Sequence, residues 1–408
     1  MSNNLHKLNH HPLILPLYLP TFIFSFCQGL LIPILPLYAA DFDVSYGLIG
    51  LVLAGETLGM LVGDVPAGMV LRRLGQKRAM LWGLACAALA TAALFWAASV
   101  PEAFLYRLLS GFSLSLFHIS RHAYMAEAIK LTSRGRAIAV FGGINRIGKF
   151  AGPAAGGIIA ALYGLRAPFL LFGLACLFAL IIMAIFVRLA AVEQGVATRI
   201  HHSHLISTLK AHYRVLGAAG AGQLFAQMIR TGRDVIIPLY AADILGLRVQ
   251  DVGFIISVAA AVDMSLFYPA GLVMDRWGRK AAIVPSFLIQ AMAMSLVPLT
   301  WSFLSLIIVA SLIGFGNGLS SGTMLTLGTD LAPRESRGEF LGVWRLIGDL
   351  GATGGPLVVG AVADLVILPT AALAMAGAGL TAVFIFALLV PETLKKHHLI
   401  SGLRTTGK

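Results

Sequence analysis

The run LILPLYLPTFIFSFCQGLLIPILPLYAA, residues 13–40, contains no Asp, Glu, Lys or Arg. A helix of about 20 apolar residues spans the hydrocarbon core of a bilayer, so this run is long enough to cross a membrane once. The rest of the chain has the same character, since 58% of the 408 residues are hydrophobic and only 12% are charged. Soluble domains carry roughly a quarter charged residues. The composition therefore predicts an all-α integral membrane protein and excludes a large extramembrane catalytic domain.

Similar apolar runs, separated by charged residues and by Pro or Gly breaks, predict twelve membrane spans. They lie at 13–40, 47–71, 78–99, 102–127, 137–163, 167–190, 214–243, 250–274, 280–301, 303–329, 339–363 and 367–391. The one long polar connection is 191–213. We therefore expect an N-terminal six-helix bundle at 1–190, a cytoplasmic linker at 191–213 and a C-terminal six-helix bundle at 214–408.

Positive charge is distributed unevenly among the predicted connections. Nearly all of their Lys and Arg residues fall on one side of the membrane, and the other side holds only Arg166 and Arg248. Cytoplasmic loops carry this excess, so we expect both termini in the cytoplasm and the protein in an inner or plasma membrane. The net charge of +12 then faces anionic membrane lipid rather than nucleic acid. The three cysteines lie far apart in apolar runs, and we expect neither metal nor cofactor.

The two halves of the sequence repeat one another. Pro-Leu-Tyr-Ala-Ala-Asp at 36–41 recurs at 238–243, a shift of 202 residues, and Gly152-Pro153 recurs as Gly355-Pro356, a shift of 203. A nearly constant shift over most of both halves predicts two six-helix repeats with the same topology. Parallel repeats of this kind are one arrangement of secondary transporters, which bind substrate near the midplane between the repeats.

Several motifs resemble those of the major facilitator superfamily. GLVMDRWGRK at 271–280 matches that family's loop signature G-x-x-x-D-R-x-G-R-K, whereas the first-half copy, GMVLRRLGQK at 68–77, has Arg72 in place of the acid. YRLLSGFS at 106–113 resembles the fourth-helix motif, and GKFAGPAAGG at 148–157 resembles the fifth-helix motif of the twelve-helix drug:proton antiporter branch. The resemblance covers essentially the whole chain. It implies a monomer with the major facilitator fold, in which two pseudo-symmetric six-helix bundles open alternately to either side.

The resemblance also implies roles for the motif residues. The loop motifs are expected to latch the outward-facing state, through Gly68, Arg72, Gly75, Gly271, Asp275, Arg276, Gly278 and Arg279. Glycines spaced about one helical turn apart let a neighbouring backbone approach closely. We therefore expect tight packing of span five on span eight through Gly148, Gly152, Pro153, Gly156 and Gly157.

Twelve charged residues lie inside the predicted spans at least five residues from either end, where each costs at least about 2.5–3.5 kcal/mol near the bilayer centre. They must face one another or a water-filled cavity, and they are Glu56, Asp64, Arg107, Arg121, Arg146, Lys149, Arg230, Arg233, Asp234, Asp263, Arg345 and Asp349. Spacing along one helix or the family arrangement of spans predicts four pairings: Arg230–Asp234, Arg345–Asp349, Asp64–Arg345, and Asp263 with Lys149 or Arg146.

Pairing leaves an excess of cations inside the spans, which favours a substrate with an anionic group, because arginine binds carboxylate and phosphate through paired hydrogen bonds. The candidate substrate contacts are Gln28, Arg121, Arg146, Arg230 and Arg233. Proton coupling requires a group that changes protonation. The candidates are Glu56, Asp234 and Asp263, and the resemblance adds Arg107. No cation lies within four residues of Glu56 on its own helix, which makes it the preferred proton acceptor.

We therefore expect a secondary active transporter that works by alternating access and couples export of a small amphipathic or organic-anion compound to protons. Proton-coupled uptake of an organic anion by symport is the alternative, because residue types do not fix the direction. A non-transporting membrane scaffold or receptor is the alternative from another class, although a scaffold has no use for so many intramembrane charges. An enzyme is not expected, since the sequence has no H-E-x-x-H metal motif and no P-loop.

Overall fold

The computed structural model describes residues 13–129, 134–187, 202–333 and 337–394, and for 134–136 and 202–215 the backbone alone. The helices of the first half are η2 (Ile14–Tyr18), α2 (Leu19–Ala40), α3 (Tyr46–Ala93), α4 (Val100–Ala128), α5 (Arg134–Tyr163) and α6 (Ala167–Phe186). Those of the second half are α7 (His202–Leu239), η4 (Tyr240–Ile244), α8 (Val249–Ser265), α9 (Phe267–Trp277), α10 (Arg279–Leu296), η5 (Val297–Leu299), α11 (Phe303–Leu319), α12 (Thr323–Leu331), α13 (Arg337–Leu365), α14 (Leu368–Phe384) and η6 (Ile385–Leu389).

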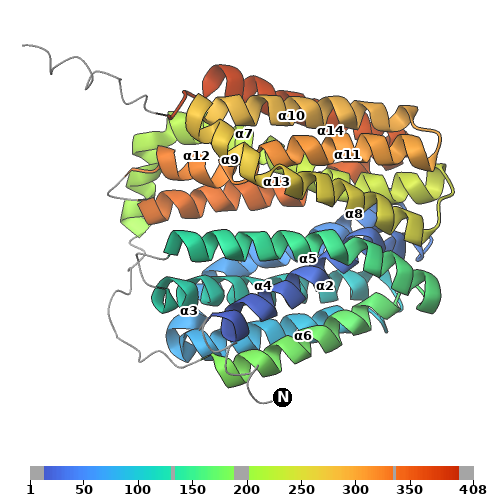
Figure 1. Cartoon of the computed structure of the whole chain (residues 1–408), viewed down its shortest axis with the longest axis horizontal. Helices are drawn as coiled ribbons and strands as arrows, with labels where there is room; N and C mark the ends of the chain where they lie inside the picture. Colours follow the sequence, from blue (N-terminus) through green and yellow to red (C-terminus); the bar gives the residue numbers. More distant parts are fainter. Residues whose placement is uncertain (1–12, 130–133, 188–201, 334–336, 395–408) are drawn as a thin grey trace, which may run out of the picture.

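The long helices run along one common direction in two bundles, α2–α6 and α7–α14 (Figure 1). Helix α3 contains the predicted spans two and three, while α8 with α9, and α11 with α12, each form one span that is broken partway. The described part of the chain thus has the twelve predicted spans in two six-helix bundles. Helix α7 begins at His202, inside the predicted linker at 191–213, of which residues up to 201 lie outside the described part.

Gly75 and Gly278 form the turns between spans two and three and between spans eight and nine. Their φ angles are +73° and +107°, a region that glycine adopts without the clash of a Cβ. Both turns lie inside the loop motifs, so the internal repeat extends to backbone conformation. We call this end of the molecule, with residues 72–78 and 276–280, the basic end, and the opposite end, with residues 41–45 and 297–302, the far end.

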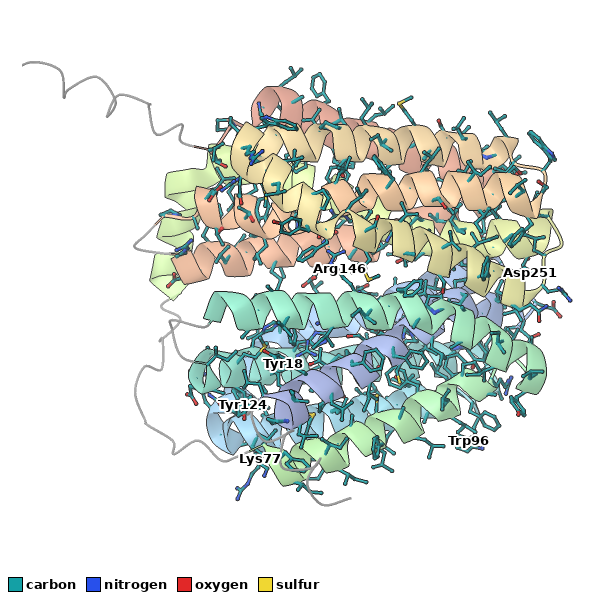
Figure 2. All side chains as sticks on the ribbon, viewed as in Figure 1. Tyr18, Lys77, Trp96, Tyr124, Arg146 and Asp251 are labelled. Atoms are coloured by element: carbon teal, nitrogen blue, oxygen red, sulfur yellow. The ribbon has the colours of Figure 1, made fainter. Side chains whose placement is uncertain are left out.

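The outer surface of the two bundles is apolar. Eight described helical segments are long and apolar enough to cross a membrane; α3 supplies two spans, and α4, α5 and α7 complete the twelve. Trp96 and Trp301 at the far end are 66% and 81% exposed, and Trp277 at the basic end is 72% exposed. Tryptophan is enriched where a membrane meets water. These exposed rings mark the two interfaces of a membrane-embedded protein, with Lys77 and Trp96 at opposite ends in Figure 2.

The two bundles cross closely near the far end at equivalent positions of the repeat. Gly50 of α3 lies against the carbonyl oxygen of Pro356 of α13, and Gly253 of α8 lies against that of Pro153 of α5. A Cβ at either glycine would overlap the opposing oxygen. Because Gly50 and Gly253 are 203 residues apart, as are the two prolines, one helix crossing is built twice.

The glycines of the fifth-helix motif serve two different contacts. Gly148, Gly152 and Gly156 face α2 of the same bundle, where an added Cβ would meet the backbone between Ser25 and Leu30. Gly157 faces α8, where a Cβ would lie 2.8 Å from the carbonyl oxygen of Val249. The prediction that the motif packs span five on span eight is therefore correct for Pro153 and Gly157 and wrong for the other three. Sequence spacing shows that glycines share a helix but not which neighbour each one meets.

Glu392, just after η6, caps the N-terminus of α10. Its carboxylate accepts hydrogen bonds from the backbone N–H groups of Arg279 and Lys280 at 2.9 Å each, and from Leu394 at 2.9 Å. Burial acts to raise the pKa of Glu392, but the backbone hydrogen bonds together lower it below its ordinary value. A carboxylate at a helix N-terminus satisfies free N–H groups and the positive end of the helix dipole.

The lowered pKa of Glu392 predicts a pH-dependent contribution to stability. The contribution is present above the ordinary glutamate pKa of about 4.3 and is lost as the pH falls through the lower folded-state value. In thermal unfolding of the purified protein, Glu392→Gln should lower the Tm at neutral pH, by the equivalent of roughly 0.5–1 kcal/mol for an exposed cap, and the difference from the unmodified protein should shrink in acid. Glu127→Gln, a change at another exposed glutamate, is the control. A Glu392→Gln difference that grows in acid would contradict this.

Candidate functional site

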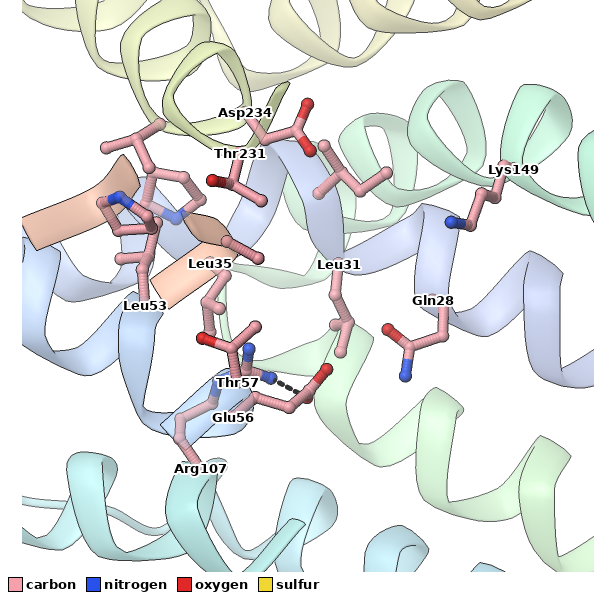
Figure 3. Close-up of a pocket in the computed structure, with 15 residues that line it drawn as sticks. Gln28, Leu31, Leu35, Leu53, Glu56, Thr57, Arg107, Lys149, Thr231 and Asp234 are labelled. Carbon is pink, nitrogen blue, oxygen red and sulfur yellow. Dashed lines mark hydrogen bonds and ion pairs between the residues drawn. The ribbon is translucent and has the colours of Figure 1, made fainter. Parts of the chain in front are cut away.

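A cavity of about 220 Å³ lies between the two bundles. Gln28, Glu56 and Lys149 point toward it from α2, α3 and α5, and Asp234 does so from α7 (Figure 3). Leucine, isoleucine and proline side chains make up much of the remaining wall. The structure therefore brings together, at the interface of the halves, several of the residues that the sequence singled out for substrate binding and coupling.

Glu56 and Arg107 form a buried ion pair in the wall of this cavity. Arg107 Nη1 lies 2.5 Å from Glu56 Oε2, and the two side chains are 8% and 15% exposed. Gly111, one turn beyond Arg107, allows α4 to lie directly against the backbone of Glu56. Glu56 therefore does have a nearby cation, contrary to the prediction from its own helix, because Arg107 reaches it from α4.

Lys149 was not among the predicted substrate contacts, yet it lines the cavity and is exposed to it. Among the described residues its ammonium group makes no hydrogen bond or ion pair. The sequence contained one available signal: Lys149 lies three residues after Arg146, so the two cations share one face of the helix. Lys149 also lines a second cavity of about 120 Å³, together with Arg233, Asp234 and Asp263.

Arg146 reaches across from α5 to the C-terminal bundle (Figure 2). Its Nη1 lies 3.3 Å from Asp263 Oδ1, its Nη2 donates to Ser321 Oγ, and its guanidinium stacks on Phe267. Asp263 also accepts a hydrogen bond of 3.0 Å from Asn317. The predicted pairing of Asp263 with Arg146 is therefore confirmed, and Arg146 already has protein partners for its charge.

Arg230 and Asp234 do not pair, contrary to the prediction from their spacing. Arg230 Nη2 donates to Ser320 Oγ at 2.6 Å and its guanidinium lies over Phe287, while Asp234 Oδ1 lies 3.2 Å from Nε of Arg233. The i, i+4 spacing allows a pair but does not exclude a better partner on another helix. Of the predicted substrate arginines, Arg233 lines a cavity, whereas Arg146 and Arg230 line neither of the two.

Arg146 and Arg230 both donate hydrogen bonds to residues at the break between α11 and α12. Gly322 has φ +76° there, and Ser320 and Ser321 accept the two guanidinium hydrogen bonds. The stretch 318–322 also has the G-x-S-x-G spacing of a hydrolase nucleophile. That motif requires a strand before the serine and a histidine as base, whereas here a helix precedes Ser320, and its hydroxyl accepts from Arg230 and donates to the carbonyl of Asn317. The spacing is coincidental.

Arg121 is buried at 6% exposure and lies between the rings of Phe117 and Phe141, 4.9 Å from each. Its Nε and Nη1 are buried and have no hydrogen-bond partner in the part of the chain that the structure describes. It lines neither cavity, so its predicted place in the substrate site remains a prediction.

Ion pairs also join the bundles toward the basic end. Arg345 of α13 lies 3.5 Å from both Asp64 of α3 and Asp349 of its own helix, so both predicted pairings are confirmed. In the second loop motif Arg279 pairs with Asp275 at 3.4 Å and with Asp330 at 2.9 Å, beside exposed Arg276.

The first loop motif cannot form the same cluster. Arg72 and Gln76 occupy the positions of Asp275 and Arg279, 203 residues earlier. The carboxylate–guanidinium pair is therefore replaced by a cation and a neutral amide. The predicted latch is asymmetric between the halves.

The cavity is closed at the far end. Gly47 N–H donates to Asp364 at 2.9 Å, and Tyr46 Oη donates to Asp243 at 3.0 Å, each from one bundle to the other. Toward the basic end, an added Cβ at Gly142 or Gly143 of α5, or at Gly271 of α9, would have no neighbour within 4 Å. The bundles are therefore hydrogen-bonded to each other at the far end, while the described helices leave open space beside these three glycines toward the basic end.

Three comparisons place this architecture among known proteins. The chain is 23% identical to an MFS-type transporter of Methanocaldococcus jannaschii, covering 86% of this chain and 90% of that one. It is also 23% identical to multidrug resistance protein 2 of Bacillus subtilis, covering 83% and 85%. Among solved structures, a bacterial homologue of the human lysosomal transporter Spinster superposes with a TM-score of 0.76 at 15% identity, over 92% and 95% of the two chains, which shows a common fold.

The sequence model of one family matches almost the entire chain, at residues 17–217 and 219–407. The two matched segments correspond to the two bundles of the structure. The paired helix crossings and the charged cavity between the bundles agree with this match. The chain belongs to the Major Facilitator Superfamily.

Proposed function

We propose that this protein, a secondary transporter that works by alternating access, exports a small amphipathic or organic-anion compound in exchange for protons. The observation that carries the proposal is the cavity between the bundles, which is lined by the Glu56–Arg107 ion pair and by Lys149, whose ammonium has no ion-pair partner among the described residues. A carboxylate paired with arginine supplies a group whose protonation changes the charge of the cavity. The ammonium supplies a contact for an anion.

The direction of transport is proposed from the charge distribution and from the relatives. The basic end is assigned to the cytoplasm by its excess of Lys and Arg, so we take the open space beside Gly142, Gly143 and Gly271 to face the cytoplasm. In this arrangement both termini are cytoplasmic and the membrane is an inner or plasma membrane. A relative named multidrug resistance protein supports export. The transporter is proposed to act as a monomer with lipid around its apolar surface.

In this mechanism the proton and the substrate use the cavity in turn. A proton that enters from the far side neutralises Glu56 and frees Arg107, which changes the charge of the cavity wall. Release of that proton to the cytoplasm re-forms the ion pair. We assign proton coupling to Glu56 and Arg107, with Asp234 as the second candidate. Asp263 ranks below both because Arg146 and Asn317 already hold its carboxylate.

Proton flux in proteoliposomes tests this function. Vesicles with an acidic interior should accumulate a permanently charged amphipathic anion, 2-naphthalenesulfonate, and should lose internal acid as they do so, as read by a trapped pH dye. Antiport moves protons out as the anion enters.

The competing functions predict other changes of internal pH in the same experiment. Anion entry that acidifies the interior would establish proton-coupled symport, the alternative function. Folded protein that moves neither anion nor proton, across this probe and basic and neutral naphthalene compounds, would contradict transport of this class and leave the scaffold or receptor.

A further inference from the structure

The two cavities are built from equivalent positions of the internal repeat. The first is lined by Leu53, Glu56, Thr57 and Arg107, and the second by Ile256, Ala259, Ala260 and Ala310, each 203 residues later. The backbone confirms the equivalence. Gly111 lies against the carbonyl of Glu56, and Gly314, 203 residues later, lies against the carbonyl of Ala259. The two cavities therefore each have one wall that is equivalent in the repeat, from the N-terminal bundle in the first cavity and from the C-terminal bundle in the second.

These two walls differ in chemistry. Where the N-terminal bundle places the Glu56–Arg107 ion pair, the C-terminal bundle has only alanine side chains, and the space is left open in the second cavity. We call this space, bounded by Ala259, Ala260 and Ala310 with neighbouring isoleucines, the alanine subsite. Its inner wall is apolar, which suits the hydrocarbon part of a ligand.

The charge beside the alanine subsite is not balanced. Arg233 pairs with Asp234 at 3.2 Å, and Asp263 pairs with Arg146 at 3.3 Å. Lys149 lines both cavities and makes no ion pair or hydrogen bond among the described residues. Its repeat-related position is Ala352, which also lines the first cavity, so the equivalent position of the C-terminal bundle carries no charge. An unpaired cation at this depth in a membrane attracts an anion.

We propose that the alanine subsite binds the apolar part of a monoanionic amphipathic substrate, whose anionic group contacts Lys149. Proton and substrate then occupy repeat-related subsites in opposite bundles. The role of the proton rests on the proposed function, whereas the binding of the anion does not. Lys149 is a specificity-determining residue in this arrangement, and Ala260 sets the room available for the apolar part.

Equilibrium binding tests this inference without a proton gradient. The full-length protein in liposomes, at equal pH on both sides, is titrated with fluorescent 2-naphthalenesulfonate and with N,N,N-trimethyl-2-naphthylammonium, a cation with the same ring. The anion should bind more tightly than the cation. Lys149→Gln should weaken anion binding at least about tenfold, equal to about 1.4 kcal/mol, Lys149→Arg should retain it, and Lys149→Glu should reverse the preference.

Two variants test whether the alanine subsite binds the apolar part of the substrate. Ala260→Phe fills the subsite and should weaken binding of the naphthalene anion at least about tenfold, equal to about 1.4 kcal/mol. Ala261→Phe, the next residue on the same helix and outside both cavities, should leave it unchanged. Unchanged binding in folded Lys149→Gln or Ala260→Phe protein would overturn the inference, as would a preference for the cation or no binding of either probe. Lysine-dependent anion binding without proton-driven accumulation would uphold this inference and refute the proposed function.

Discussion

Glu56→Gln is expected to abolish proton-driven accumulation of substrate, with a loss of at least about 100-fold, equal to about 2.8 kcal/mol, while substrate-for-substrate exchange at equal pH continues. Glutamine keeps the length of the side chain and can accept the hydrogen bond from Arg107 Nη1, but it cannot bind a proton in the working pH range. Exchange requires only that the loaded carrier can reorient. Accumulation requires a group whose charge differs between the two sides. Uptake of 2-naphthalenesulfonate with and without an acidic interior measures both activities.

Two further variants separate this role from a structural one. Asp349→Asn is the matched control, because Asp349 also pairs with an arginine, at 3.5 Å, but lies outside both cavities; it should keep accumulation. Breaking a buried pair leaves the other charge uncompensated, which costs about 3–5 kcal/mol. The double change Glu56→Gln with Arg107→Gln removes both charges and should fold but remain uncoupled. Proton-driven accumulation by folded Glu56→Gln protein would exclude Glu56 as the coupling group. If accumulation is lost in Asp234→Asn but not in Glu56→Gln, the coupling role belongs to Asp234.

Gly142→Trp is expected to hold the protein open at the basic end and to reduce transport about 100-fold or more, as expected when overpacking costs about 3 kcal/mol in the closed form. Gly142 lies one turn before Arg146 on the face of α5 that meets the other bundle, and an added Cβ there has no neighbour within 4 Å. The open form therefore has room for the indole. We expect the basic end to close by bringing this face against α9, in the way that α5 and α8 meet through Gly253 and Pro153.

Measuring binding and transport together distinguishes a protein held open from one that no longer binds substrate. The Gly142→Trp protein should bind 2-naphthalenesulfonate as the unmodified protein does, because its cavity stays accessible, yet fail both accumulation and exchange. Ile147→Trp, on a face of α5 where the residue is 47% exposed, should transport normally. Normal exchange by Gly142→Trp would show that this face does not take part in closure.

Much of the architecture was predictable from the sequence because it depends on local or repeating features. Hydropathy and charge along the chain indicate the spans, and the repeat predicts two bundles with one topology. Even the crossing of Gly50 on Pro356 and of Gly253 on Pro153 follows the shift of 203 residues. Two pairings, Asp64–Arg345 and Asp263–Arg146, were predictable only from the order of spans that the family motifs imply.

The partners of the remaining charges could not be predicted, because a linear sequence shows neighbours on one helix but not across helices. Glu56 has no cation on its own helix, and Arg107 arrives from the next one. Arg230 has Asp234 four residues away, yet it contacts Ser320 on another span instead. The carboxylate and the guanidinium each take the partner that lies closest in space once the spans are packed.

The sequence by itself determined that this chain is a membrane protein of twelve helices in two related halves, with charged residues inside, because those properties follow from the composition and spacing of residues along each span. Only the tertiary structure decided which charges neutralise one another and which one is left over. Arg146 and Arg230, the expected anion contacts, instead bind Asp263 and the serines at the break in span ten. Among the described charged residues that line the two cavities, only Lys149 has no ion-pair partner. Charges inside a membrane are neutralised by contacts of a few ångströms between helices, and no pattern along the chain shows which residues make these contacts.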